Sequence, residues 1–217
     1  MVIEVGDGEG LSARQRQVLD AALALLVAEG DRLTMTGVAR CANCSKETLY
    51  KWFGGRDGLL TAIVQWQASG VRIAPVGTGT IDRPALAARL ERFAADWLAV
   101  ITSPTSVALN RLAVGHAGTG EADLGRTVLA NGRFALARRL KPVLEAARAA
   151  GLVAFDDAEE AFRTFFGLVV RDVQIRLLLG DRARPEGAAI AADAARATTQ
   201  FLALYGVRSR PARAGQT

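Results

Sequence analysis

Apolar residues recur along most of this chain at the spacing of one face of a helix. The first such stretch opens at Ser12, which has the form of a capping box with Gln15, and it ends at Gly30. Its apolar positions are Val18, Leu19, Ala22, Leu23, Leu26 and Val27. The same pattern predicts later helices at about 82–101, 104–116, 120–150, 156–179 and 185–205. Because no strand alternation or internal repeat is sustained, the chain is predicted to be all-α.

The stretch 34–60 departs from this pattern and predicts a helix-turn-helix. Thr34 is suited to cap a short helix that ends near Ala42, and Ser45 is suited to cap the next helix. Asn43, between them, enters left-handed backbone conformations at lower cost than most residues, as a tight turn between steeply crossed helices requires. A further helix is expected to follow directly.

The second helix of this unit has a narrow apolar face. At 100° per residue, Leu49 and Phe53 share that face. The opposite side carries Glu47, Thr48, Lys51 and Trp52. A short helix with such an outward surface suits insertion into a major groove, where side chains meet base edges and phosphates. The alternative is an ordinary solvated helix on an all-α core.

The same residues resemble a known family. The stretch 14–60, with AALALLVAEG, T-x-T-x-VA, SKETLYKWF and R-D-x-LL, is similar to the DNA-binding domain of the tetracycline-repressor (TetR) family of bacterial regulators. The resemblance implies an all-α homodimer. Its N-terminal three-helix domain would bind DNA, and a larger C-terminal helical domain would bind an effector and form the dimer.

The resemblance also implies contacts with double-stranded DNA. In the family, the positions of Lys46 and Thr48 contact bases or backbone, and those of Tyr50 and Trp52 pack on the sugar-phosphate. Arg56 opens the next helix at a phosphate-contacting position. With Thr36, whose counterpart reaches the groove from the preceding helix, the predicted DNA-binding set is Thr34, Thr36, Ser45, Lys46, Glu47, Thr48, Tyr50, Lys51, Trp52 and Arg56.

The chain departs from the family pattern in four places. Asn43 replaces a usual Gly and Cys44 a usual Val, Glu47 replaces a usual Gly, Ala or Pro, and Gly54-Gly55 replaces a stiffer turn. Glu47 matters most, because an acid facing DNA weakens general attraction to phosphates and can accept from a cytosine amino group. We therefore expect some loss of general affinity and a gain in selectivity.

Composition divides the chain into four parts. Residues 1–10 are acidic and rich in glycine, residues 207–217 are basic, and both segments are predicted to be disordered. Residues 11–55 form the predicted DNA-binding domain, and residues 56–206 form the effector-binding and dimerisation domain. Gly, Pro and Thr gather at 71–80, which predicts a loop after the helix that joins the two domains.

The middle helices of the larger domain are predicted to enclose an effector pocket. Apolar walls with a few convergent polar groups are typical of ligand sites. The candidates are Phe93, Trp97, Asn110, Arg111, His116, Phe134, Phe166 and Arg171. Core packing is the alternative for each aromatic residue. The alternatives for Arg171 are an ion pair with an acid across the dimer interface or a position on a solvated face. The alternative for His116 is a solvent-exposed position.

The last two helices are apolar on more than one side, which predicts two packing partners. One is the protein's own core, and the other is a second copy of the chain. The predicted interface residues are Phe162, Phe165, Val169, Val173, Ala188, Ala192 and Ala195. Two helix-turn-helix units related by a two-fold axis would read a palindromic operator. The alternative is a buried helix pair in a monomer.

Composition and charge are compatible with this interpretation. The chain has 217 residues, of which 50% are apolar and 23% charged, and a formal net charge of +5, so it can bury a sizeable core. The stretch 11–56 holds seven basic and four acidic residues, a modest positive charge that DNA binding tolerates. Residues 1–10 lack an export signal, and no run of 18 uncharged apolar residues occurs, so we expect a cytoplasmic protein without a membrane partner.

Enzymes are the rival class. The chain has one histidine, and no nucleophile elbow, phosphate-binding loop or dinucleotide fingerprint accompanies it. No cofactor and no metal site are predicted. Cys41 and Cys44 form a C-x-x-C at the turn, where a disulfide would distort the DNA-reading unit. The alternative is that Cys44 packs as a small hydrophobe.

The sequence therefore predicts a sequence-specific DNA-binding transcriptional regulator. It is expected to be a repressor that an unknown small-molecule effector releases from a palindromic operator. A non-regulatory all-α ligand-binding protein or enzyme is one alternative, and a repressor that responds to thiol redox state through Cys41 and Cys44 is another. An architectural DNA-binding protein would not need so large an apolar helical body.

Overall fold

The computed structural model describes residues 10–71, 81–117 and 124–207, and they form helices joined by short connections. The elements are α1 (Ala13–Glu29), the 3₁₀ turn η1 (Gly30–Arg32), α2 (Met35–Cys41), α3 (Lys46–Phe53), α4 (Arg56–Ala68), α5 (Arg83–Ile101), α6 (Pro104–Gly115), α7 (Leu124–Asn131), α8 (Arg133–Ala149), α9 (Ala158–Val170), α10 (Val173–Leu178) and α11 (Ala188–Tyr205). Within these ranges β-type pairing is limited to an isolated antiparallel bridge between Val153 and Gly206. The prediction of an all-α fold is confirmed.

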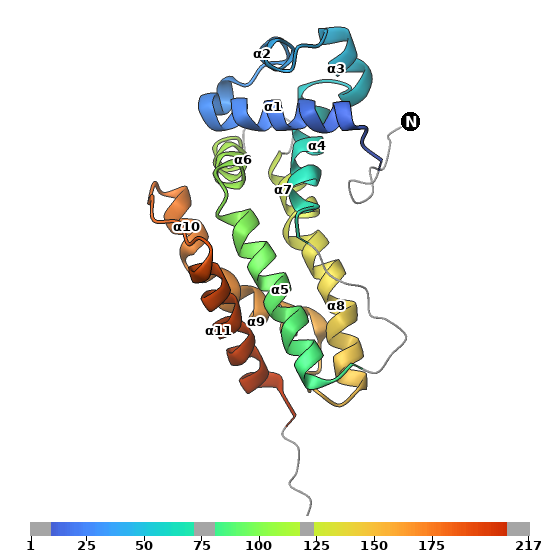
Figure 1. The fold of residues 1–217 in the computed structure, drawn as a ribbon, viewed down its shortest axis with the longest axis vertical. Helices are drawn as coiled ribbons and strands as arrows, with labels where there is room; N and C mark the ends of the chain where they lie inside the picture. The colour runs from blue at the N-terminus through green and yellow to red at the C-terminus, as the bar shows by residue number, and fades with distance from the viewer. Residues whose placement is uncertain (1–9, 72–80, 118–123, 208–217) are drawn as a thin grey trace, which may run out of the picture.

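The helices are arranged as a small module on the end of a longer bundle (Figure 1). Helix α1 lies across the end of the molecule with α2 and α3 outside it, and α4 runs from this module toward the bundle. Helices α5, α8, α9 and α11 form the bundle, and the last helix ends far from the module. Helix α4 therefore connects the two parts along the chain, and α6 also packs on α1.

The module has its own apolar core. The capping box at Ser12 starts α1, which buries Val18, Leu19 and Leu26. Leu49 of α3 and Ile63 of α4 are fully buried in the same cluster. The cluster also includes residues from α6 and α7: Leu109, Leu112, Ala113 and Leu124. The division of domains at 55/56 stays a prediction, and the packing groups the buried residues of α4 with α1 to α3.

The bundle has a second core that is rich in aromatic rings. Phe93 and Trp97 of α5 meet Phe162 and Phe165 of α9, and all four side chains are at most 2% exposed. The ring of Trp97 stacks on that of Phe162 with centroids 6.2 Å apart. Burying a side chain of this size stabilises the fold by about 1.5–3 kcal/mol, so these rings fix how α5 and α9 pack.

Two long predicted helices are each divided in the structure. The prediction at 120–150 is interrupted at Gly132, which has φ −90° and ψ −105°, and α8 then continues as one helix through Pro142. The interruption therefore lies before Pro142, although a proline inside a helix is the residue expected to kink it. The prediction at 156–179 is interrupted at Arg171, which adopts φ 44°.

The predicted terminal segments and most of the predicted 71–80 loop lie outside the described residues. Among the helices that the structure does describe, none combines the length and the apolar character needed to cross a bilayer.

Candidate nucleic-acid interface and ligand cavity

Local hydrogen bonds shape the helix-turn-helix as predicted. The Thr34 hydroxyl accepts from the Gly37 amide at 3.0 Å and starts α2, and the Ser45 hydroxyl accepts from the Thr48 amide at 3.1 Å and starts α3. Between them Asn43 adopts φ 48°. The caps and the left-handed turn predicted from the sequence are confirmed.

A side chain from α1 holds this turn. One terminal nitrogen of Arg14 donates to the carbonyl oxygens of Ala42 and Asn43, each at 2.8 Å. Both carbonyls belong to the turn, so the guanidinium fixes the place of α3 relative to α1. Sequence reasoning missed this role, because nothing in the local pattern around Arg14 shows that a segment 28 residues later folds against it.

Most of the predicted DNA-binding residues form an exposed surface on α2 and α3. The exposed members of the set are Thr34, Thr36, Ser45, Lys46, Glu47, Tyr50 and Lys51. Tyr50 is 50% exposed although it is aromatic. These residues lie at the end of the molecule where α2 and α3 are (Figure 1), away from the bundle.

Three members of the set are half-buried: Thr48, Trp52 and Arg56. The ring of Trp52 packs on the module core and meets Phe53 edge-on, with centroids 6.3 Å apart. The prediction that Trp52 lies on the outward side is therefore wrong for much of the ring. The Arg56 guanidinium donates to the Leu33 carbonyl at 3.2 Å, which ties the start of α4 to the start of α2.

Glu47 brings a negative charge to this surface. Its own backbone amide, the Ser45 hydroxyl and the neighbouring Lys46 ammonium stabilise the carboxylate, so the pKa of Glu47 is lower than usual. Glu47 is therefore ionised at neutral pH. It repels phosphates and can act only as an acceptor toward a base edge.

A cavity of about 230 Å³ lies where α4 meets the bundle. Its walls are mainly apolar, with two rings, three side-chain amides, one hydroxyl and one guanidinium. The lining residues are Val64, Gln67, Ala68, Val71, Trp97, Val100, Ile101, Ser106, Leu109, Asn110, Val128, Leu129, Gly132, Arg133, Leu136, Phe166 and Gln174. Of the predicted pocket residues, Trp97, Asn110 and Phe166 are in this wall.

The other predicted pocket residues lie elsewhere. Phe93 is buried behind Trp97, with ring centroids 5.7 Å apart, and Phe134 is 44% exposed. Arg111 donates to the Leu177 carbonyl at 2.7 Å and, with His116, borders a separate, more open cleft between α1 and α6. Arg171 forms an ion pair with Asp193 of α11 at 2.9 Å.

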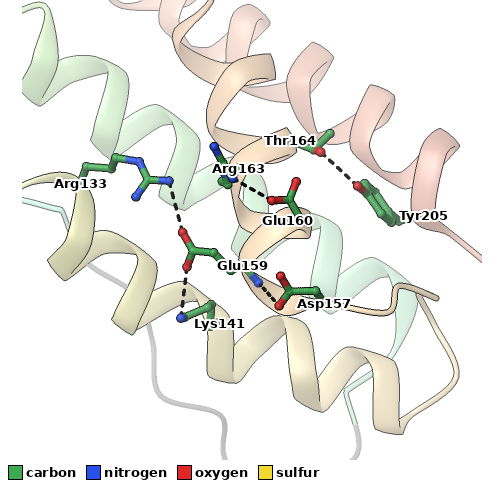
Figure 2. A network of polar contacts seen from close by, with 8 residues as sticks. All are labelled: Arg133, Lys141, Asp157, Glu159, Glu160, Arg163, Thr164 and Tyr205. Atoms are coloured by element: carbon green, nitrogen blue, oxygen red, sulfur yellow. Dashed lines mark hydrogen bonds and ion pairs between the residues drawn. The ribbon is translucent and has the colours of Figure 1, made fainter.

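Arg133 is the charged residue of the cavity wall that sequence reasoning missed. Its guanidinium pairs with Glu159 at 3.2 Å, and Lys141 pairs with the other oxygen of the same carboxylate at 3.2 Å (Figure 2). Partial burial would raise the pKa of Glu159, but the hydrogen bonds from Lys141 and Arg133 outweigh it and lower that pKa. Glu159 is thus an ionised bridge between α8 and α9.

Another arginine of α8 holds the far end of α4. A terminal nitrogen of Arg139 donates to the Ala68 carbonyl at 3.0 Å and to the Val71 carbonyl at 3.2 Å. Carbonyls at a helix C-terminus lack partners within the helix and carry partial negative charge, so a cation is favourable there. The C-terminal end of α4 is therefore tied to α8 on the same side as the cavity.

Two family models match the chain. Residues 18–63 match the bacterial regulatory proteins of the tetR family, and residues 88–207 match the C-terminal domain of AefR-like transcriptional repressors. The second match spans more than half of the sequence. The chain belongs to the TetR family.

Solved structures of TetR-family proteins have the same fold. A TetR transcriptional regulator from Agrobacterium tumefaciens is 47% identical, with a TM-score of 0.78, over 91% of this chain and 97% of that chain. A TetR-family regulator from Mesorhizobium loti MAFF303099 is 23% identical, with a TM-score of 0.70, over 89% and 97% of the two chains. The flavonoid-responsive regulator FrrA is 26% identical, with a TM-score of 0.65, over 90% and 98%. Among curated proteins the chain has no match.

Membership of the TetR family identifies the chain as a DNA-binding transcriptional regulator and not an enzyme. TetR-family regulators bind DNA and form dimers. The helix-turn-helix described above is the DNA-binding part, and the bundle corresponds to the AefR-like C-terminal domain.

Some residues that were predicted for the dimer interface of this TetR-family protein lie in the protomer's own core. Phe162 and Phe165 are fully buried there, and Val169 is 2% exposed, so they have no surface left for a partner. Their apolar character is explained by packing on α5 and α11. Of the remaining candidates, Ala188 and Ala192 are exposed, whereas Val173 and Ala195 are half-buried.

The two cysteines of the C-x-x-C differ in environment. Cys41 is exposed at the end of α2, and Cys44 is half-buried against the module core, as expected for a small hydrophobe. Both are free thiols in the structure. Across the described ranges, no group of three or more His, Cys, Asp or Glu side chains is placed to hold a metal ion.

Proposed function

We propose that this TetR-family protein is a homodimeric repressor that binds a palindromic operator through α2 and α3. A small molecule entering the cavity releases it from the operator. The observation that carries the proposal is the double role of α4, whose residues line the cavity and also complete the core of the DNA-binding module. Such a protein would act in the cytoplasm.

Helix α4 shares its side chains between the two parts. Leu59 and Ile63 are fully buried in the module core, whereas Gln67 and Ala68, about one turn after Ile63, line the cavity. Packed cores do not deform gradually, so a ligand that moves the end of α4 moves the module with it. In a dimer this changes the separation of the two recognition helices, which must match successive major grooves.

Energetic coupling of this kind is reciprocal. If the ligand lowers operator affinity by some factor, the operator lowers ligand affinity by the same factor. The structure supports this coupling through Arg139, which ties the C-terminal end of α4 to α8 beside the cavity. The similar regulator FrrA is described as flavonoid-responsive, which supports a small molecule as the effector.

The outward side of α9 and α11 supports the homodimer. It presents small residues that allow close approach of a second copy, and they are Gly167, Ala188, Ala189, Ala192, Ala195 and Ala203. A two-fold dimer contacts itself through the same patch on both copies, and it places two identical DNA-binding modules on one duplex. Half-sites about one helical turn apart are then expected.

Selection of binding sites from random duplex DNA tests the proposal. Purified protein is incubated with the library at fixed salt, and the bound fraction is sequenced, while mass photometry gives the oligomeric state. Enrichment of a palindrome by a dimer supports the proposal. Recovery of no enriched sequence, or binding by a monomer to a single half-site, contradicts it.

A further inference from the structure

We propose that the effector of this cavity is a small aromatic carboxylate whose anionic group pairs with Arg133. This inference rests on the proposed function, because it names the ligand class of the same cavity. It is argued from three properties of the wall: its net charge, its rings and its size.

The charge near the cavity favours an anion. Arg133 is the charged residue of the wall, and its partner Glu159 is shared with Lys141. The three groups together carry one net positive charge. If a ligand carboxylate takes the guanidinium, Glu159 keeps the Lys141 ammonium 3.2 Å away and is not left unpaired (Figure 2). Replacing the partner of Arg133 therefore costs less than breaking an isolated ion pair.

The backbone reinforces this preference. Arg133 is the first residue of α8, and Gly132 before it supplies no side-chain cap. Both residues line the cavity. The first amides of α8 have no carbonyl partner within that helix and can donate to a negative group nearby. A cationic ligand would face the Arg133 guanidinium.

The apolar wall favours a planar ligand. Trp97 and Phe166 both line the cavity, with ring centroids 4.7 Å apart. Arg133 lies over the Phe166 ring at 5.7 Å. A ligand ring can pack against the half-buried Phe166 ring and the small part of Trp97 that lines the cavity, with its carboxylate at the guanidinium.

The size of the cavity sets the size of the ligand. Its volume of about 230 Å³ is smaller than the roughly 300–1,000 Å³ of pockets for drug-sized ligands. A single ring with a short acidic side chain fits this space better than a polycyclic ligand. The amides of Gln67, Asn110 and Gln174 in the wall can hydrogen-bond a ring hydroxyl.

Calorimetric titration of the full chain tests the ligand class. The probes are benzoate, 4-hydroxybenzoate and 3-phenylpropenoate, each compared with its neutral primary amide at pH 7.5, where the carboxylates are ionised. At least one carboxylate is expected to bind, and its amide at least about tenfold more weakly, since a hydrogen bond to a charged group is stronger than one to a neutral group. This comparison uses only the wild-type chain, so it does not depend on whether a variant folds.

Variants around Glu159 give a pattern that a merely structural role would not produce. R133Q is expected to weaken carboxylate binding by about 10- to 100-fold and to leave amide binding unchanged. E159Q frees the guanidinium and is expected to tighten carboxylate binding severalfold. K141Q leaves Glu159 paired with Arg133 alone and is expected to weaken carboxylate binding. R148Q removes the contacts of Arg148 with Glu145 and Phe155, which lie outside the cavity wall, and as the control it is expected to leave ligand binding unchanged.

The outcomes separate this inference from the proposed function. Equal binding of carboxylate and amide, unchanged binding in R133Q, or no binding by any probe overturns the inference, and selection of an operator would still support the repressor. Arg133-dependent binding without any change in operator affinity supports the ligand class and contradicts the proposed release mechanism.

Discussion

Single side chains set the geometry of the DNA-binding surface, and Arg14 is the one whose role is least visible in the sequence. Its guanidinium donates to the carbonyls of Ala42 and Asn43 in the turn before α3. We expect R14A to lower the free energy of unfolding by about 1–2 kcal/mol, because two carbonyls lose a charged donor at a partly exposed site. Thermal or urea unfolding measures this loss.

The same substitution separates charge from geometry when it is compared with R14K. A lysine keeps the charge but cannot present the forked donors of a guanidinium. We expect R14K to fall between the wild type and R14A in stability and in operator affinity. Equal stability of the wild type, R14K and R14A would show that the turn keeps its conformation without the contacts from Arg14.

Contacts with DNA are argued at the same scale. Lys46 and Tyr50 are exposed on α3, at positions that the family resemblance assigns to bases or backbone. We expect K46A and Y50F each to weaken operator binding by about 1–3 kcal/mol if they reach bases or phosphates. Fluorescence anisotropy with a labelled operator measures the change. R92Q on α5, remote from the module, is the control, and unchanged affinity in both α3 variants would refute the assigned face of the helix.

Local features of the site were predictable from the sequence, and long-range features were not. The caps at Thr34 and Ser45 and the left-handed Asn43 depend only on neighbouring residues, and all three are confirmed. Trp97 was predicted as a pocket residue and lines the cavity, whereas Arg133 was not predicted. The position of Arg133 depends on the interruption at Gly132 and on the approach of α9, which periodicity along one segment does not reveal.

At the scale of helices, the contact between α3 and α4 depends on a residue without a side chain. A Cβ added at Gly58 would lie 1.7 Å from the Phe53 carbonyl oxygen at the end of α3. We expect G58A to push the start of α4 away from α3 and to destabilise the fold by about 1–3 kcal/mol or more. Operator affinity should fall as well, because α3 is held against α4.

A second glycine provides the control for G58A. Gly115 ends α6, and nothing lies within 4 Å of a Cβ placed there. We expect G115A to leave stability unchanged or to raise it by about 0.4–1 kcal/mol, since alanine restricts the unfolded chain. Equal unfolding midpoints for G58A and the wild type would mean that α3 and α4 can separate at no cost.

The tie between α8 and α9 makes stability depend on pH. Hydrogen bonds from Lys141 and Arg133 lower the pKa of Glu159 in the folded protein below its ordinary value of 4.5. The folded state then binds fewer protons than the unfolded state, so this group stabilises the fold fully above pH 4.5 and loses its effect as the pH falls through the folded pKa. We expect E159Q to be less stable than the wild type at pH 7, and the difference to shrink toward pH 3 in urea unfolding. A constant difference would show that the ion pairs contribute nothing.

The extents of the helices show where periodicity is insufficient. The helices predicted at 82–101 and 104–116 match α5 and α6 within a residue at each end. The predictions at 120–150 and 156–179 continued across Gly132 and Arg171, because apolar spacing persists on both sides of each interruption. A positive φ at an arginine has no local signal, because arginine adopts this conformation rarely.

At the scale of the whole molecule, the two apolar sides predicted for the last helices have separate explanations. The rings of Phe162, Phe165 and Phe201 face the protomer's own core, and their side chains are fully buried. The exposed small residues of α11, Ala188 and Ala192 among them, are the part of the prediction that stays available for a partner. Periodicity showed that the last helices are apolar on two sides. It did not show which residues pack on the protomer's own core, because α5 covers that side only in the folded chain.

Dimerisation gives the last prediction. Ala192 is exposed on α11, so A192D places a charge on the proposed interface without disturbing the protomer's core. We expect mass photometry to show a monomer and circular dichroism to show a folded chain. Binding to the full palindrome should weaken by about 10²–10⁴-fold, because the second module no longer benefits from the high local concentration that the dimer provides. Affinity for a single half-site should stay the same.

The control places the same charge on another helix. A99D changes an exposed alanine of α5 that lies outside the proposed interface, and it should remain dimeric with full operator affinity. If A192D stays dimeric, the two copies meet through some other surface, and the separation of the recognition helices is then set by that surface. If A192D is monomeric but binds the palindrome as tightly as the wild type, one module suffices for recognition, and movement of α4 could not release the protein by changing the spacing of two modules.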